Sequence, residues 1–182
     1  MDRVDSLFEE IERARRERRL PPVEKWQPAH VGSIDIRIAR DGTWFHEGRP
    51  ILRQPLVDLF ATVLRREGDA YFLVTPGEKL QIVVEDVPFL GVRLTRDGDG
   101  LAQRLRLSTN VGDHVAIDAA HPIVMREHDG QAAPYVMVRS GLEARLVRSV
   151  YYELVELGEE AGGTWVVHSE GIAHPLGAVA LE

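Results

Sequence analysis

The chain has 182 residues and a formal net charge of −7, so it lacks the positive surface expected of a general nucleic-acid binder. It contains no cysteine, which excludes disulfides, thiolate nucleophiles and thiolate metal ligands. The sequence starts without the apolar segment of a signal peptide, and no run approaches the roughly 18 apolar residues that a membrane span needs. We therefore expect a soluble, cytoplasmic protein.

A helical arm is predicted at the N-terminus, over residues 1–25. Within residues 3–19 five apolar side chains fall at helical spacing: Val4, Leu7, Phe8, Ile11 and Ala14. The prolines at positions 21 and 22 end this helix, because proline lacks a backbone donor. The basic segment at 13–19 alternates with glutamate and favours a solvated helix face; a nucleic-acid contact is the alternative.

An N-terminal α+β domain is expected over residues 26–98. Alternating isoleucines at 34–38, followed by the turn Asp41-Gly42, predict a β-hairpin. The next segment predicts a helix with five inward-facing residues: Leu56, Leu59, Phe60, Val63 and Leu64. Three strands should follow, at about 70–75, 79–85 and 89–95. The repeated Asp-Gly at 97–100 is the expected domain boundary.

A mostly antiparallel, β-rich domain is expected over residues 99–182. Turn residues separate five strand patterns, at 101–107, 114–117, 123–126, 135–139 and 142–147. Residues 149–158 combine helical spacing with β-prone aromatic residues, and we favour a helix over a strand there. A last strand is predicted at 164–168.

Residues 70–94 recur in outline at 134–158, at a constant offset of 64 residues. The identical pairs are Tyr71 and Tyr135, Val74 and Val138, Gly77 and Gly141, Val83 and Val147, and Leu90 and Leu154. This pattern suggests one strand-turn-strand unit used twice. Two unrelated hairpins that share a generic alternation are the alternative.

Five segments also carry a resemblance to a known family: DGTWFHEGRPI (41–51), LVTPGEK (73–79), EDVPF (85–89), LSTN (107–110) and LEARLVR (142–148). Over about residues 26–180 the chain resembles the bacterial family DUF1285, a domain of unknown function. The resemblance implies two α+β halves with a partial structural duplication, the C-terminal half being similar to pleckstrin-homology-like folds. It further implies a ligand site between the halves, with a nucleotide in signal transduction as the candidate. The segment 174–177, HPLG, departs from the aromatic residues that the resemblance leads us to expect before Leu-Gly.

The sequence contains no reaction motif. Its seven histidines form neither HxH nor HExxH pairs, so we expect no metal site. A GxSxG nucleophile turn and the glycine-rich phosphate loops of nucleotide enzymes are likewise missing. We therefore expect no cofactor and name no catalytic residue, and we lean against an enzyme.

A candidate binding site comes from polar and aromatic residues at strand ends. The turn TPGEK has backbone donors that could hold an anion, and arginine forks match phosphate or carboxylate geometry. The predicted ligand-binding residues are Trp44, His46, Thr75, Glu78, Lys79, Tyr135, Arg139, Arg145 and Arg148. In the alternative interpretation these cations pair with glutamates on the surface, where such pairs contribute little.

These features predict non-enzymatic binding of a small anionic molecule, with a nucleotide as one candidate, at the interface of the two halves. One alternative is an enzyme that uses His46 and Glu78 as an acid–base pair, which requires the two side chains to lie within hydrogen-bond reach. Another is a protein-interaction module that docks a partner through the N-terminal helix or the C-terminal half.

Overall fold

The computed structural model describes residues 4, 6, 7, 11 and 20–178. At Val4, Ser6, Leu7 and Ile11 the backbone is helical, and the three apolar side chains of this group are buried. The remainder of the predicted helix at 3–19 lies outside the described residues. The chain divides into two compact units, Met1–Asp86 and Val87–Glu182, which we call the N-terminal and C-terminal domains. None of the described helices is long and apolar enough to cross a membrane.

The N-terminal domain is built on a six-stranded sheet, which we call sheet A, with the order β3-β2-β1-β6-β5-β4. Its strands are β1 (His30–Ile38), β2 (Trp44–His46), β3 (Arg49–Pro50), β4 (Leu64–Glu67), β5 (Ala70–Val74) and β6 (Glu78–Val84). The predicted hairpin after Ile34 is present, because β1 and β2 pair in antiparallel register. However, β1 and β6 run parallel, so the sheet is mixed and not purely antiparallel.

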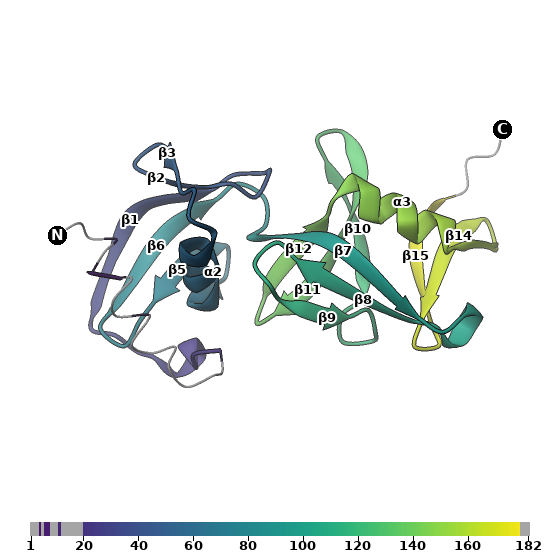
Figure 1. Cartoon of the computed structure of the whole chain (residues 1–182), viewed down its shortest axis with the longest axis horizontal. Helices are drawn as coiled ribbons and strands as arrows, with labels where there is room; N and C mark the ends of the chain where they lie inside the picture. Colours follow the sequence, from purple (N-terminus) through teal and green to yellow (C-terminus); the bar gives the residue numbers. More distant parts are fainter. Residues whose placement is uncertain (1–3, 5, 8–10, 12–19, 179–182) are drawn as a thin grey trace. The chain divides into compact units, whose positions relative to one another are not determined.

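Helix α2 (Gln54–Thr62) connects the two halves of sheet A and contributes to the core. Its residues Leu59 and Phe60 are fully buried, and the Phe60 ring stacks on Trp44 of β2 with centroids 6.2 Å apart. Figure 1 shows α2 beside the strands of this domain. The predicted helix extended to Leu64, but the helix ends at Thr62 and Leu64 begins β4, where it pairs with Leu73. Apolar spacing could not separate these outcomes, because Leu64 is buried in either one.

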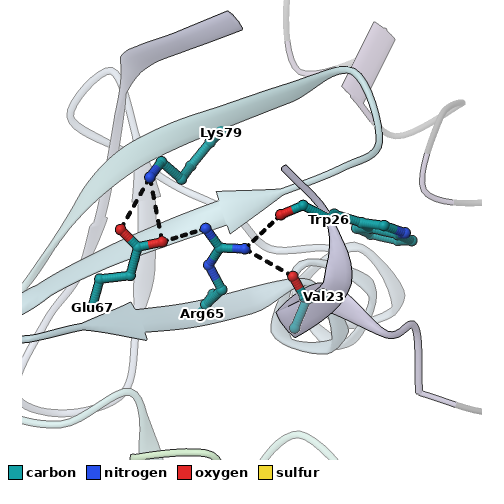
Figure 2. Close-up of polar contacts among 5 residues, drawn as sticks. All are labelled: Val23, Trp26, Arg65, Glu67 and Lys79. Carbon is teal, nitrogen blue, oxygen red and sulfur yellow. Dashed lines mark hydrogen bonds and ion pairs between the residues drawn. The ribbon is translucent and has the colours of Figure 1, made fainter. Parts of the chain in front are cut away.

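A short 3-10 helix, η1 (Val23–Lys25), lies before sheet A in the sequence. It is attached to strand β4 through Arg65, whose Nη1 donates to the backbone oxygens of Val23 at 2.9 Å and Trp26 at 2.8 Å. Arg65 is buried, and its Nη2 also contacts the carboxylate of Glu67. Figure 2 shows these contacts and the Lys79 side chain that shares Glu67 with Arg65.

The C-terminal domain has a second six-stranded sheet, sheet B, with the order β10-β11-β12-β7-β8-β9. Its strands are β7 (Phe89–Asp97), β8 (Arg104–Thr109), β9 (His114–Ala116), β10 (Ile123–His128), β11 (Gln131–Arg139) and β12 (Leu142–Leu146). This sheet is also mixed, because β12 pairs with β7 in parallel. The other pairs of sheet B are antiparallel, so the domain is mostly antiparallel as predicted, although the parallel central pair was not foreseen.

Helix α3 (Arg148–Glu156) follows sheet B, in agreement with the helix favoured at 149–158. A small antiparallel sheet, sheet C, completes the domain with β13 (Glu159–Ala161), β14 (Thr164–Ser169) and β15 (Ile172–Ala178). Figure 1 shows α3 near β14 and β15. The last predicted strand corresponds to β14, whereas β13 and β15 were not predicted. Strand β13 is exposed throughout, and β15 contains Pro175 and Gly177, which are disfavoured in strands.

The domain boundary predicted at 97–100 is wrong. Strand β7 pairs with β8 in antiparallel register up to Asp97 and Arg104, so the Asp-Gly segment belongs to a turn inside the C-terminal domain. That turn includes the short 3-10 helix η2 (Gly100–Ala102), and Gly98 and Gly100 both have positive φ. The division instead follows Asp86, next to the Pro88 that precedes β7. Glycine-rich turns mark chain reversals within a sheet as readily as linkers between domains.

Sheets A and B share one order of connections. In each sheet the first three strands form a meander, the last three form a second meander, and the first and last strands make the parallel central pair. The two sequence segments of the repeat, at 70–84 and 134–148, fall on the last hairpin of each sheet. The correspondence stops after this hairpin, because residues 89–97 form strand β7 whereas residues 148–156 form helix α3.

Candidate anion-binding site

The predicted site residues of the N-terminal domain have local structural partners. Trp44 is only 1% exposed and stacks on Phe60 in the core, so its ring offers no face to a ligand in this structure. Among the described residues its Nε1 has no hydrogen-bond partner. The prediction that Trp44 stacks on a ligand is therefore wrong. The alternating pattern of the strand did not show which face of the sheet is buried, and Trp44 lies on the buried face.

The TPGEK turn is closed by its own hydrogen bonds. The backbone N–H of Thr75 donates to the Glu78 oxygen at 2.9 Å, and the Glu78 N–H donates to the Thr75 hydroxyl at 3.1 Å. Lys79 forms an ion pair with Glu67 at 3.0 Å, and its Nζ lies 4.8 Å from the centroid of the Phe72 ring. Figure 2 shows Lys79 directed at Glu67. Two donors that we expected to hold an anion thus bond within the turn, and Lys79 pairs on its own sheet.

His46 and Glu78 do not form the acid–base pair of the enzyme alternative. His46 is opposite Ile36 of β1, whereas Glu78 is opposite His30 at the start of the same strand. The six residues from His30 to Ile36 span about 20 Å of extended chain, far beyond hydrogen-bond reach. This pair is therefore excluded as a catalytic unit within the N-terminal domain.

Tyr135 and Arg139 of the C-terminal domain are also engaged on their own sheet. Tyr135 is 2% exposed, and the Arg126 guanidinium lies 4.0 Å above its ring centroid. Arg139 pairs with Asp113, with its Nε at 3.2 Å from the carboxylate, and its guanidinium carbon lies 5.2 Å from the centroid of the Phe89 ring. These contacts make both residues part of the packing of sheet B.

Arg145 and Arg148 differ from the other predicted residues, because both line a pocket. Its volume is about 150 Å³, and its wall comes from the turn between β10 and β11, the end of β12 and the first turns of α3. The lining residues are His128, Gln131, Ala132, Ala133, Pro134, Arg145, Leu146, Arg148, Tyr151 and Tyr152. The pocket is formed by the C-terminal domain alone.

Local sequence explains how these groups meet. Asp129 and Gly130 both have positive φ, which closes the two-residue turn between β10 and β11 and places His128 opposite Gln131. The register of β11 and β12 sets Tyr135 opposite Arg145. Val147 then joins β12 directly to α3, so Arg148 and Tyr151 follow within one helical turn.

The polar groups of this pocket favour an anion. Two guanidinium groups and one imidazole line it, and no carboxylate does among the described residues. Arg148 is fixed by a hydrogen bond from its Nη2 to the Gln131 side-chain oxygen at 2.7 Å. The His128 ring has contacts at both nitrogens: the Tyr135 hydroxyl lies 3.4 Å from Nδ1, and the Asp129 carboxylate, which does not line the pocket, lies 3.4 Å from Nε2. In addition, α3 starts at the pocket without a side-chain cap, and the positive end of its dipole favours negative charge.

Two tyrosines supply an aromatic edge to the pocket. Tyr151 and Tyr152 stack with ring centroids 6.3 Å apart, and Tyr152 is 55% exposed. The hydroxyl of Tyr151 donates to the Leu176 oxygen at 3.2 Å, which anchors the inner ring to sheet C. Sequence reasoning missed four polar or aromatic members of this site, namely His128, Gln131, Tyr151 and Tyr152. The sequence feature that could have indicated this site is the pair Tyr151 and Tyr152, which follows Arg148 by about one helical turn.

Comparison with known proteins identifies the family. A model described as "Domain of unknown function (DUF1285), N-terminal domain" matches residues 21–87, and one described as "Protein of unknown function (DUF1285), C-terminal domain" matches residues 88–176. The chain belongs to the DUF1285 family. The two matches meet between residues 87 and 88, close to the division between the compact units.

Two solved DUF1285 structures are similar to this chain. The protein from Silicibacter pomeroyi is 43% identical, with a TM-score of 0.88 and 95% of each chain covered. The protein from Shewanella baltica is 31% identical, with a TM-score of 0.54, covering 66% of this chain and 90% of its own. No curated protein matches the chain. The fold is thus shared with relatives whose descriptions state no activity.

Proposed function

We propose that this DUF1285 protein binds a small anionic ligand without chemical conversion, in the pocket that Arg145 and Arg148 line. The observation that carries the proposal is the convergence of two guanidinium groups and an imidazole in one concave site with no lining carboxylate among the described residues. Guanidinium forks bind phosphate or carboxylate oxygens in pairs, which gives both affinity and orientation.

Pocket size limits which part of the ligand is enclosed. Sites for whole drug-sized molecules occupy about 300–1,000 Å³. A volume of about 150 Å³ suits a phosphate or carboxylate group and leaves the remainder of the ligand outside. The exposed ring of Tyr152 lies at the edge and offers a stacking surface for a planar group. A nucleoside phosphate combines both features, and a role in signal transduction is an extension of this proposal.

The finer description of the fold is also a proposal. The shared order of connections in sheets A and B, with the repeated hairpin at equivalent places, supports a duplication. The similarity of the C-terminal half to pleckstrin-homology-like folds remains a prediction from the family resemblance.

Calorimetry and thermal shift with AMP, adenosine and inorganic phosphate test the binding proposal. We expect AMP to raise the melting temperature and adenosine to have no effect, because adenosine lacks the anion. The variants Arg145→Ala and Arg148→Ala should each weaken AMP binding about tenfold, in line with loss of one charge-assisted hydrogen bond. Arg93→Ala is the matched control, since Arg93 is an exposed arginine of the same sheet outside this pocket. No stabilisation by AMP or phosphate at about millimolar concentration would contradict the proposal.

A protein-interaction module is a second candidate function. Val31 and Val83 are each 58% exposed and lie on the neighbouring strands β1 and β6. Lys79 is opposite Val31, and Lys79 and Val83 fall on one face because side chains alternate along a strand. A pull-down in which Val31→Ser and Val83→Ser lose a partner that Arg145→Ala retains would favour this function over ligand binding.

A further inference from the structure

A buried histidine, His174, lies at the contact between strands β15 and β10. Its side chain is 2% exposed. The backbone N–H of Ile123, the first residue of β10, donates to His174 Nδ1 at 3.4 Å. Among the described residues its Nε2 has no partner. Because Nδ1 accepts a hydrogen bond, the neutral ring carries its proton on Nε2. The bond to Ile123 therefore attaches β15 to β10 only while Nδ1 is unprotonated.

A second contact links β15 to the pocket of the proposed anion site. The hydroxyl of Tyr151, which lines this pocket, donates to the backbone oxygen of Leu176 at 3.2 Å. Leu176 is the extra residue of a β-bulge, because its two neighbours on β15 pair with the consecutive residues Trp165 and Val166 of β14. The extra residue of a bulge is left out of the ladder, so its carbonyl group is available to the tyrosine. Strand β15 thus connects His174 to Tyr151.

The charges that face His174 come from two other segments. Burial lowers the pKa of His174, the Asp118 carboxylate raises it, and His168 of β14 lowers it. Asp118 Oδ1 lies 3.0 Å from His121 Nδ1, and His168 Nδ1 lies 3.4 Å from the carboxylate of Glu159 on β13. The net effect is a lowered pKa, so these surroundings favour the neutral ring.

We infer that His174 positions Tyr151 in a pH-dependent way: the neutral ring holds β15 against β10, and protonation releases this strand. An imidazolium ion has two N–H donors and no acceptor, so a protonated Nδ1 would face the N–H of Ile123, donor against donor. Burying a charge and an unpaired donor is costly. Below the ordinary pKa of about 6.5 the released ring takes up a proton more readily than the held ring. The released population therefore grows by up to about tenfold for each pH unit, until the pH reaches the lowered pKa of the held ring.

The consequence for ligand binding rests on the proposed function. Release of β15 removes the acceptor of the Tyr151 hydroxyl, so the inner aromatic wall of the pocket loses its anchor and anion binding weakens in acid. His128 lines the same pocket, and a histidine that becomes charged in acid attracts anions, which acts in the opposite direction. Binding is therefore measured with His128→Gln as the background.

Amide hydrogen exchange tests the release of β15 without a ligand. The wild type is compared with His174→Asn, whose side-chain oxygen can accept the bond from Ile123 but does not titrate, and with His174→Phe, which has no acceptor. Between about pH 7.5 and about pH 5.5 we expect the protection factors of Ile123 and β15 to fall by up to about tenfold per pH unit in the wild type. In both variants they should not change with pH. The control His114→Gln, an exposed histidine of β9, should follow the wild type. An equal fall in the wild type and in either variant would overturn the inference.

Calorimetry with inorganic sulfate tests the link to the pocket, because sulfate keeps its charge over this pH range. In the His128→Gln background we expect the affinity to fall about tenfold between about pH 6.5 and about pH 5.5. Adding His174→Asn, or adding Tyr151→Phe to remove the bond to Leu176, should abolish this fall. A fall that persists in both double variants, or an affinity independent of pH in the background, would overturn the link. The absence of sulfate binding at about pH 7.5 would contradict the proposed function, whereas the exchange measurements would still decide whether His174 releases β15.

Discussion

Arg65 donates a hydrogen bond of 2.9 Å to the backbone oxygen of Val23, which lies 42 residues earlier in the chain. The same nitrogen also reaches the Trp26 oxygen, so one buried guanidinium satisfies two carbonyl groups of the segment around η1. Because guanidinium has five donors in a fixed fork, no other side chain could make these contacts together with the contact to Glu67. This single residue therefore fixes the segment that precedes sheet A.

We expect Arg65→Met to destabilise the N-terminal domain by about 2–4 kcal/mol. Methionine fills part of the volume but leaves two carbonyl groups without a donor, and the loss of a buried charged partner is costly. Denaturation in urea measures the change in the free energy of unfolding. Arg49→Met is the control, because Arg49 lies exposed on β3. Equal stability of the two variants would show that the fork contributes little.

Hydrogen bonds from Lys79 and Arg65 hold the pKa of Glu67 below its ordinary value. Because the pKa of Glu67 is lower in the folded chain than in the unfolded chain, its ionisation stabilises the fold at any pH above the ordinary pKa of about 4.3. This stabilisation is lost as the pH falls through the lowered folded-state pKa. We expect Glu67→Gln to lower stability at neutral pH and to flatten its decline in acid. Urea denaturation between about pH 6 and pH 3 measures both effects. A parallel decline in wild type and variant would refute the assignment.

Burial lowers the pKa of His174, which is 2% exposed. Its Nδ1 lies 3.4 Å from the backbone N–H nitrogen of Ile123, and among the described residues its Nε2 has no partner. Below the ordinary pKa of about 6.5 the unfolded chain binds a proton at this residue before the folded chain does, so stability falls as the pH drops. That decline ends once the pH is below the lowered folded-state pKa.

We therefore expect His174→Phe to show a smaller loss of stability between about pH 7 and pH 5 than the wild type. Phenylalanine retains a planar ring in the core but cannot be protonated. His114→Gln serves as the control, because His114 is an exposed histidine of β9 in the same domain. If the wild type and His174→Phe have the same pH slope in urea denaturation, this histidine is not the source of acid sensitivity.

Gly158 has no room for a side chain. A Cβ atom there would lie 2.5 Å from Trp165 Nε1 and 2.8 Å from the backbone oxygen of Val166. We expect Gly158→Ala to destabilise the C-terminal domain by about 1–3 kcal/mol, since overpacking forces backbone shifts. It should also alter Trp165 fluorescence by disturbing the hydrogen bond to Val155. Ala173→Ser is the comparison, because Ala173 lies exposed on β15 of the same domain. An unchanged Trp165 spectrum in Gly158→Ala would contradict this packing.

Sequence patterns predicted the elements more reliably than their pairing. Alternation at 34–38 and the turn at Asp41-Gly42 gave the first hairpin, and helical spacing gave α2 and α3. The parallel central pairs β1–β6 and β7–β12 were not predicted, because each brings together strands that are distant in sequence. The position of the domain boundary was missed for a related reason: a turn motif does not reveal whether its two strands pair.

Of the predicted binding residues, the structure brings Arg145 and Arg148 together in one pocket. Both were named from the sequence and line the pocket for which we propose anion binding, whereas Lys79 and Arg139 pair with Glu67 and Asp113. Residue type alone could not distinguish these cases, because an arginine that lines a pocket and one that binds a carboxylate of its own sheet have the same local pattern.

The amino-acid sequence by itself determined the family, the absence of thiol chemistry and the local structure of most hairpins, since composition and side-chain periodicity act over a few residues. The tertiary structure decided which polar groups meet. Strand register placed His128 and Arg145 at one pocket, which helix α3 completes with Tyr151. Register also separated His46 from Glu78 along β1. Register depends on contacts between distant segments, and a shift of one residue turns every side chain to the other face of a sheet.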